Sequence, residues 1–308
     1  MTDSGSLGTV GIKLLDAPTA REQDPRAHEY IIDHVAPGTA IQRRVQITST
    51  ARTTMHVDLY AGAATIDAGR FDFADGDSPN DLTDWVTIAP PSRDLPAGGT
   101  ETVPVTIRVP PQASAGERYA VLWAQVSAAP ADATGVRMAA RAGVRVYLDV
   151  GPGGEPPSDF QILSLTPARG VDGRPQVLAQ VRNTGQRALD MTGDLRLSDG
   201  PSSLSAGPFP VQLGTTLGIG QSEPVAVSLD TLLPDGPWTA RLTLASGTVQ
   251  HTISVTLTFP HTAGAGVPVA PSSSLTSATH LLLSGALLAA GALFVYMLLR
   301  RRRAGTLD

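Results

Sequence analysis

An uncharged apolar run near the C-terminus constrains the chain more than any other feature. It extends from Leu281 to Leu299 without a charge or a proline. At 1.5 Å per residue, these about 19 residues form roughly 28 Å of helix, enough to cross the hydrocarbon core of a bilayer. Cationic flanks resist translocation, and the residues that follow directly are Arg300, Arg301, Arg302 and Arg303. We therefore predict one transmembrane helix over 280–299, a basic cytoplasmic tail over 300–308 and an extracytoplasmic N-terminal part.

Two other interpretations of this run stay open. One is a buried core helix, although no other helix is expected that would cover it. The other is a C-terminal sorting tail that is removed after export, although neither a sortase-type nor a lipid-anchor site precedes the run convincingly.

The N-terminus conflicts with export, because Met1 to Gly8 contains neither a basic n-region nor an apolar h-region. We expect that a signal peptide is missing from this sequence. A tail-anchored cytosolic protein is the alternative. Its C-terminus would have to cross the membrane with four arginines, which is unfavourable.

The composition excludes several classes of function and of binding site. The formal net charge is -5, so we expect no nucleic-acid partner. The chain has no cysteine, which excludes disulfides, thiol chemistry and cysteine-type zinc sites. Its 308 residues are enough for two domains and a membrane tail.

From residue 8 to 150 the apolar pattern has a period of two, as in Met55, Val57 and Leu59. Turn signals such as Pro37-Gly38 separate the apolar runs at intervals of about 8 to 12 residues, and no long amphipathic helix intervenes. This pattern predicts an antiparallel β-sandwich of immunoglobulin-like type. Pro104 lies inside one predicted strand, which should therefore be an edge strand or bulged.

The remaining boundaries follow from composition. Residues 151–159 are rich in Gly and Pro and predict a linker, and residues 160–259 contain about seven further strands, which predict a second sandwich. Residues 260–279 are rich in Pro, Ser and Ala and predict a disordered stalk. The fold class is thus all-β, with two tandem immunoglobulin-like β-sandwich domains, a stalk and one C-terminal transmembrane helix.

An acid-rich segment, residues 71–85, is the first candidate binding site. A solvated loop is the preferred interpretation, because the spacing does not match a helix-loop-helix calcium site. Calcium binding is the alternative, with the carboxylates as ligands: Asp72, Asp75, Asp77 and Asp81.

Two tryptophans, Trp85 and Trp123, are the other candidates. They would contribute sugar stacking in a ligand site, but tryptophans in sandwiches are more often core residues. His28-Glu29 begins like a zinc-protease helix, yet Ile32 stands where the second histidine is needed. The sequence contains no Gly-x-Ser-x-Gly motif. We expect no cofactor, no catalytic residue and no enzymatic activity.

Several strings of the first domain resemble those of a known family. They are Gly11-Ile12-Lys13-Leu14, Ala36-Pro37-Gly38-Thr39, Gly69-Arg70-Phe71, Arg108-Val109-Pro110-Pro111 and Ala115-Gly116-Glu117-Arg118-Tyr119. With them the chain resembles the WxL-interacting proteins, which are surface proteins of Gram-positive bacteria, in an actinobacterial-like variant. The resemblance covers about residues 8 to 303. It implies a peptidoglycan-binding first domain and a host-protein-binding second domain.

The chain lacks a Trp-x-Leu motif, because its three tryptophans are followed two residues later by Thr87, Gln125 and Ala240. The resemblance therefore makes it a partner of Trp-x-Leu proteins. We expect a membrane-anchored cell-surface binding or adhesion protein whose partners are the membrane, peptidoglycan and WxL-type or other surface proteins. An extracytoplasmic scaffold or chaperone-like assembly protein is the first alternative, and an envelope enzyme acting on glycan is the second.

The predicted topology is testable in intact cells. Protease added from outside should digest residues 8–259 and spare the short basic tail, because only the N-terminal side of the apolar run is exposed. Immunoblotting with antibodies against each end would follow the two parts. Intact sandwiches beside a digested tail would reverse the assignment.

Overall fold

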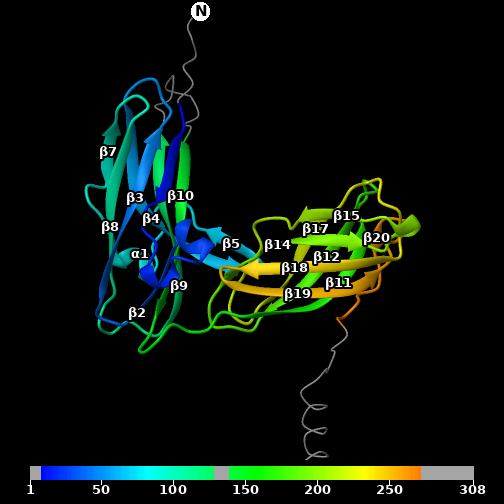
Figure 1. Cartoon of the computed structure of the whole chain (residues 1–308). Coiled ribbons are helices and arrows are strands. Elements are labelled where there is room, and N and C mark those ends of the chain that lie inside the picture. The colour runs from blue at the N-terminus through cyan, green and yellow to red at the C-terminus, as the bar shows by residue number, and fades with distance from the viewer. Residues whose placement is uncertain (1–7, 128–138, 272–308) are drawn as a thin grey trace, which may run out of the picture. The chain divides into compact units, whose positions relative to one another are not determined.

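The computed structural model describes residues 8–127 and 139–271. These residues form strands, one short α-helix and a few 3-10 turns (Figure 1), which confirms the predicted all-β class. Residues up to Ala270 belong to one compact unit. Across the described ranges, no helix has the length and apolar character needed to span a membrane. The apolar run from Leu281 to Leu299 and the arginines from Arg300 to Arg303 lie outside those ranges.

Two sheets form the first sandwich. The bounds of its strands are β1 (Val10–Leu14), β2 (Ile31–Val35), β3 (Ala40–Ser49), β4 (Met55–Asp67), β5 (Arg70–Phe73), β6 (Val86–Ile88), β7 (Ser92–Leu95), β8 (Thr100–Arg108), β9 (Gly116–Ser127) and β10 (Ala139–Val150). One sheet has the order β1-β3-β8-β6. The other has the order β2-β10-β9-β4-β5, with β7 also paired to β4.

Period-two alternation places one side of each strand in the core between these sheets. On β8, Val103, Val105 and Ile107 are fully buried, and on β3 Val45, which lies opposite Val103, and Ile47 are buried as well. Because successive side chains on a strand point to opposite faces, the intervening polar residues face outward. The predicted inward residues of these strands are confirmed.

The prediction for the strand that contains Pro104 was wrong. Strand β8 is an inner strand of its sheet, paired with β3 along its length, and its ladder shows no bulge. The proline is tolerated because β6 ends opposite Val105. Pro104 therefore has a ladder neighbour only on the β3 side and needs no second hydrogen bond.

Strand β2 pairs in parallel with β10, from Ile31 opposite Val146 to Val35 opposite Val150. The sequence pattern predicted antiparallel pairing throughout. The difference arises because the chain leaves β1 in one sheet and crosses to the other through two 3-10 turns, η1 (Thr19–Arg21) and η2 (Pro25–His28). It therefore enters the second sheet in the direction of β10.

The second sandwich follows the linker. Its strands are β11 (Phe160–Arg169), β12 (Pro175–Asn183), β13 (Leu189–Asp190), β14 (Thr192–Ser198), β15 (Ala206–Pro210), β16 (Thr216–Leu217), β17 (Ser222–Ser228), β18 (Trp238–Ser246), β19 (Val249–Leu257) and β20 (Gly264–Ala265), with the 3-10 turn η3 (Pro201–Ser203) before β15. One sheet has the order β17-β12-β11-β20, another β15-β14-β18-β19, and β13 pairs with β16. A separate apolar core, which includes the fully buried Trp238, lies between them.

The predicted stalk begins too early. Residues 264–265 form β20, which pairs with the end of β11, and Val269 bridges Leu165. Strand β11 otherwise has a free edge on this side, so the chain after Phe259 supplies backbone hydrogen bonds that β11 needs. Only the part of the stalk after residue 271 lies outside the described chain.

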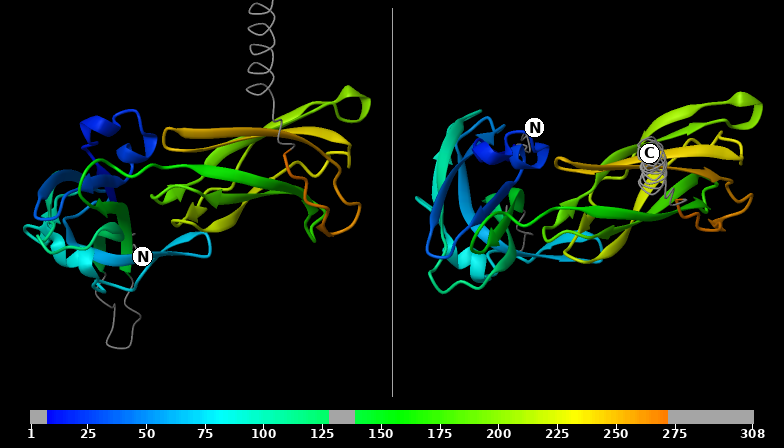
Figure 2. Two further views of the ribbon diagram at one scale, coloured as in Figure 1. Left: turned by 90° about the horizontal axis from the view of Figure 1, so that it is seen from below. Right: turned by 60° about the horizontal axis from the view of Figure 1, so that its bottom comes forward.

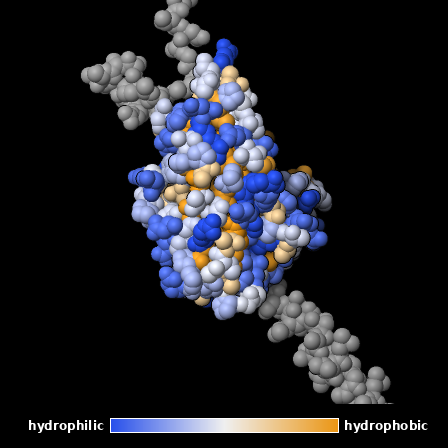
Figure 3. All heavy atoms as spheres, turned by 90° about the vertical axis from the view of Figure 1, so that its left-hand side faces the viewer, coloured by the Kyte–Doolittle hydropathy of each residue, from blue (hydrophilic) through white to orange (hydrophobic). Residues whose placement is uncertain are grey.

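The surface gives no single broad apolar patch on the face shown in Figure 3. Apolar side chains there lie in narrow, interrupted strips among polar ones. Scattered exposure of this kind is normal for a folded protein and does not by itself mark an interface.

Candidate functional site

The β4–β5 hairpin reaches from the first sandwich to the second (Figure 1, Figure 2). Its two-residue turn, Ala68-Gly69, has positive φ at both positions, as a type I′ turn requires. The carbonyl of Gly69 accepts a hydrogen bond from the amide of Thr216, at 2.8 Å. This contact brings β16 against the outer face of the first sandwich.

Asp190 of β13 is the centre of one polar cluster at this junction. Its Oδ2 accepts from Nε of Arg26 at 2.9 Å, and its Oδ1 accepts from the hydroxyls of Tyr147 at 2.9 Å and Thr216 at 2.7 Å. Arg145 Nη1 also donates to Oδ1, at 3.0 Å. One carboxylate of the second sandwich is thereby held by two arginines and a tyrosine of the first.

Arg187 is the centre of a second cluster and is only 2% exposed. Its Nε donates to Oε1 of Glu117 at 2.7 Å, and its Nη1 pairs with Glu155 of the linker. Oε2 of Glu117 accepts from the amide of Ala188 at 2.7 Å and from the hydroxyl of Tyr119 at 2.9 Å. Charged groups this deep are stable only when they are paired and hydrogen-bonded.

Arg21 connects this cluster to the 3-10 turns. It donates to Asp24 at 2.6 Å and pairs with Glu155, which it shares with Arg187. Burial, together with the nearby charge of Arg187, lowers the pKa of Arg21 below its usual range. Glu155 thus separates two cations that would otherwise repel each other.

An aromatic cluster lies beneath the two ionic clusters. The rings of Tyr30, Phe71 and Tyr119 surround Tyr147, with centroids 5.2 to 5.8 Å from it. The Arg145 guanidinium stands over Phe71 at 4.7 Å. Burial, together with the charge of Asp190, raises the pKa of Tyr147 well above its usual value, and burial beside Glu117 also raises that of Tyr119.

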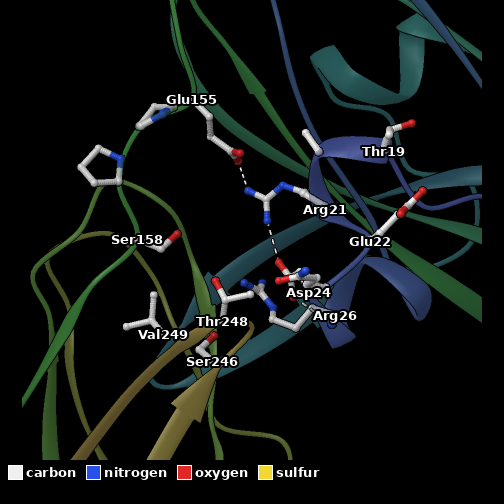
Figure 4. Close-up of a pocket in the computed structure, with 14 residues that line it drawn as sticks. Thr19, Arg21, Glu22, Asp24, Arg26, Glu155, Ser158, Ser246, Thr248 and Val249 are labelled. Carbon is white, nitrogen blue, oxygen red and sulfur yellow. Dashed lines mark hydrogen bonds and ion pairs between the residues drawn. The ribbon is translucent and has the colours of Figure 1, made fainter.

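A pocket of about 590 Å³ opens beside these clusters (Figure 4). It lies between the 3-10 turns, the linker and the β18–β19 turn, and in Figure 4 Arg21 points to both Glu155 and Asp24. Both arginines of the lining are already paired, Arg21 with those acids and Arg26 with Asp190. The hydroxyls of the lining are those of Thr19, Ser158, Ser246 and Thr248. This chemistry suits a neutral polar ligand better than an anion.

The structure does not bring the candidate calcium ligands together. Asp72 lies on β5, Asp75 and Asp77 lie in the following turn, and Asp81 is the first residue of α1 (Asp81–Trp85). Asn80 caps this short helix, accepting a hydrogen bond from the amide of Thr83 at 3.0 Å. Within residues 8–127 and 139–271, no three His, Asp or Glu side chains are placed to share a metal ion.

Trp123 is not placed for sugar stacking. It is 6% exposed, and its ring lies against Gly143, where an added Cβ would come within 2.7 Å of ring atoms. The Arg141 guanidinium stands over the ring at 4.2 Å, and Phe73 contacts it edge-on. Trp85 is half-buried against the first core, with Arg118 at 4.9 Å over its ring.

Strand β10 carries a further feature, an incompletely paired edge. Strand β9 pairs with one side of β10 from Ala139 to Val150. On the other side, β2 pairs only from Val146 onward. Within the described chain, residues 139–145 therefore have no ladder partner on that side. They run beside β1, which is itself the end strand of the opposite sheet. Cα atoms of the two strands approach within 8 Å of each other, so the two strand edges adjoin. We call their boundary the β1–β10 seam.

Sequence reasoning missed both the junction and the seam. Arg187 and Asp190 stand three residues apart in a polar segment that looks like an ordinary turn, and their partners in the first sandwich lie 43 to 164 positions away in the chain. Arg43 was the one detectable signal of a buried pair. It stands among inward residues of β3 and pairs with the buried Asp33.

Comparison with known proteins gives a distant likeness only. No family model and no curated protein matches the chain. Among solved structures, it is similar to the Salmonella enterica SafA pilin–SafB chaperone complex, with 10% identity over 82% of this chain and 99% of that chain, and a TM-score of 0.44. The E. coli chaperone DraB gives 10% identity, 80% and 100% coverage and a TM-score of 0.39.

A third similar structure is the CsuC-CsuE chaperone-tip adhesion subunit complex of Acinetobacter baumannii, with 14% identity, 73% and 94% coverage and a TM-score of 0.38. Scores this low carry no conclusion about a partner or an activity. Membership of the WxL-interacting proteins stays a prediction.

The Arg187–Glu117 pair generates a stability prediction. Glu117→Ala leaves Arg187 buried without its main partner, so the free energy of unfolding should fall by about 3 to 5 kcal/mol. Urea unfolding followed by circular dichroism measures this change. Arg44→Ala, which breaks the exposed pair with Asp16, is the control and should change stability far less. Equal effects of the two substitutions would contradict the assigned role of the buried pair.

The buried tyrosines generate a pH prediction. In the unfolded chain a tyrosine loses its proton near pH 10, whereas Tyr147 and Tyr119 keep theirs to higher pH in the folded protein. A folded pKa above the unfolded one means that stability is lost as pH rises above about 10. Thermal unfolding between pH 8 and 11 should show this decline, and a shallower slope is expected for Tyr147→Phe. An unchanged slope would show that Tyr147 ionises freely.

Proposed function

We propose that this chain is a non-catalytic binding protein of the cell surface that holds an extended segment of another exported protein along β10. The observation that supports this most directly is the unpaired edge at residues 139–145 in the described structure. An edge of this kind presents a row of backbone donors and acceptors, which is the template for strand addition.

The side chains of the β1–β10 seam suit an added strand. Val144 points into the first core, so Ala142 and Ala140, two and four residues earlier, lie on the same side of β10. Both alanines are small, and neither is fully buried. On the opposite edge, Val10 and Leu14 of β1 are buried in the same core, with Ile12 partly buried. A strand that pairs with β10 would place alternate apolar side chains over these residues.

The outward-facing side chains of residues 139–145 lie outside the proposed binding surface. Arg141 is held over Trp123, and Arg145 is held by Asp190 at the junction. Both cations are therefore engaged on the outer face, away from the seam. Main-chain hydrogen bonds would supply affinity and the seam would select small or apolar side chains at alternate positions, as in other strand-addition complexes.

The sequence predicts the cellular location in which this binding would take place. The apolar run from Leu281 to Leu299 and the arginines after it favour a single-pass anchor with the sandwiches outside the cytoplasm. In that setting the partners available to the seam are other exported proteins, including the WxL-type proteins that the family resemblance implies. A long-lived complex would retain the partner at the cell surface, and a short-lived complex would release it for assembly into a larger structure. The seam would bind the partner in the same way in both cases.

A second candidate function is binding of peptidoglycan, and the junction pocket is the observation that favours it. Its volume of about 590 Å³ lies within the range of small-ligand sites. Its hydroxyl groups and already neutralised arginines match the chemistry of a neutral glycan better than that of a charged ligand. This candidate places the ligand at the junction and leaves the seam empty.

Photo-cross-linking separates the two candidates. A photo-reactive residue at Ala142 in cells should link to an exported protein, within one extended peptide that mass spectrometry identifies. The same residue at Thr87, exposed on β6 at the other edge of the sandwich, should not. Muropeptide adducts, or equal protein adducts from both positions, would count against strand addition.

A charge in the seam should block the partner. Ala142→Lys forces an ammonium group between the sheets when a strand is added, so the affinity for the cross-linked partner should fall tenfold or more, about 1.4 kcal/mol. Thr87→Lys adds the same charge elsewhere and is the control. Purified variants are compared by calorimetry, with thermal unfolding to show that both are folded. Equal affinity of the two variants would exclude the seam as the binding surface.

A further inference from the structure

Exposed apolar side chains gather at one end of the second sandwich. In the described chain, the large apolar residues with high exposure include Val171 at 101%, Leu232 at 88% and Leu204 at 47%. Each stands in a different loop, whereas Val267, 79% exposed, lies two residues after β20 on the edge beside β11. Isolated exposed residues are normal, but three such residues from three loops at one end are not scattered singly.

Strand register shows that these loops share an end. The β11–β12 turn follows Arg169, which pairs with Pro175, and β17 ends at Ser228 opposite Gln176. In the other sheet, Ser198 lies opposite Thr239, and Trp238 opposite Leu257. Residues 170–174, 199–205, 229–237 and 258–263 therefore extend from the end opposite the β18–β19 turn (Figure 1). We call them the distal loops.

The distal loops are tied to one another by Arg169. Its Nη1 donates to the carbonyl of Gly173 at 2.7 Å, its Nε to that of Pro260 at 2.6 Å, and its Nη2 to Asp235 at 2.5 Å. These three acceptors belong to three different loops. A single buried guanidinium thus holds the loops in fixed positions, and the apolar tips project from a rigid base.

Trp238 supports the remaining loop. Its Nε1 donates to the carbonyl of Pro234 at 2.9 Å, and its ring lies against Gly200, where an added Cβ would come within 2.1 Å of ring atoms. The η3 loop, which carries Leu204, therefore rests directly on the fully buried indole. The apolar residues of the distal loops are therefore exposed in loops that the folded sandwich holds in place.

The chain after Pro271 indicates what these tips meet. Nine residues separate Pro271 from the apolar run at Leu281, and at most about 3.6 Å per residue they span roughly 35 Å. A bilayer that holds the run therefore lies within short reach of the second sandwich. Tethering at this distance raises the effective concentration of lipid near the loops, so that a small apolar contact suffices.

We propose that the distal loops contact the outer surface of the membrane, with Val171 and Leu232 entering the interface between headgroups and acyl chains. This inference rests on the proposed membrane anchoring. Acidic residues outnumber arginines in and beside these loops: Asp172, Asp199, Asp230 and Asp235 against Arg169 and Arg174. The contact is therefore apolar in origin, and it weakens as the fraction of anionic lipid rises.

The test uses a fluorescent label whose emission depends on polarity. Because the chain has no cysteine, Val171→Cys, Leu232→Cys and Leu213→Cys each give one labelling site in the full chain. Leu213 is 82% exposed and stands on the same sandwich after β15, away from the distal loops. In vesicles of zwitterionic lipid, labels at 171 and 232 should shift to shorter wavelength and be quenched by nitroxide lipids, and the label at 213 should not.

Two results would overturn the inference. Labels at 171 and 232 that behave like the label at 213, in chains that co-sediment with the vesicles, would show an anchored protein whose distal loops stay in water. A shift that grows with anionic lipid would show an electrostatic contact in place of the apolar one. Chains that fail to co-sediment at all would contradict the proposed anchoring itself, which keeps the two failures distinct.

Discussion

The position of the second sandwich on the first depends on charges that neither sandwich neutralises alone. Arg187 is almost fully buried, and its partner Glu117 belongs to the other sandwich. Asp190 is held in the same way by Arg26 and Arg145. Separating the sandwiches would leave these ions without partners, which costs several kcal/mol for each. The junction is therefore a specific, ionic joint and not a flexible link.

This joint also orders the proposed binding strand. Strand β10 carries Arg145 and Tyr147 to Asp190 on its outer face, and Val144 and Val146 to the core on its inner face. From Val146 onward it is paired on both sides, and before Val146 it is paired on one side only, as far as residues 8–127 and 139–271 show. The unpaired segment thus continues a strand whose other half is held firmly. A partner strand added there would meet a preformed backbone, which lowers the entropy cost of binding.

Much of the fold was predictable because side-chain alternation is a local property. The inward residues of β3 and β8 and the second set of strands follow from the pattern of apolar residues, and the linker over 151–159 follows from its Gly and Pro content. Pro104 shows where that reasoning ends. A proline cannot donate a backbone hydrogen bond, but this alone does not show whether β8 is an edge strand. That depends on where the neighbouring strand β6 ends, about 16 residues away from Pro104 in the chain. The same holds for Val269, whose pairing with Leu165 removes ten residues, 260–269, from the predicted stalk.

The candidate sites also divide into those that residue type alone suggests and those that depend on long-range contacts. Trp85, Trp123 and the aspartates from Asp72 to Asp81 were named because of residue type, and the structure uses the tryptophans in packing and disperses the acids. The junction ions and the seam could not be named, because a buried pair and an unpaired edge are defined by residues far apart in the chain.

By itself, the sequence determined the all-β class, the division into two sandwiches and the apolar run that favours a membrane anchor, since each is a matter of composition or short period. Only the tertiary structure decided which strands lie side by side, where β10 lacks a neighbour and which charges are buried together. Pairing between strands is a long-range property, and the energies of hydrogen bonds and ions depend on the partners that folding brings into contact.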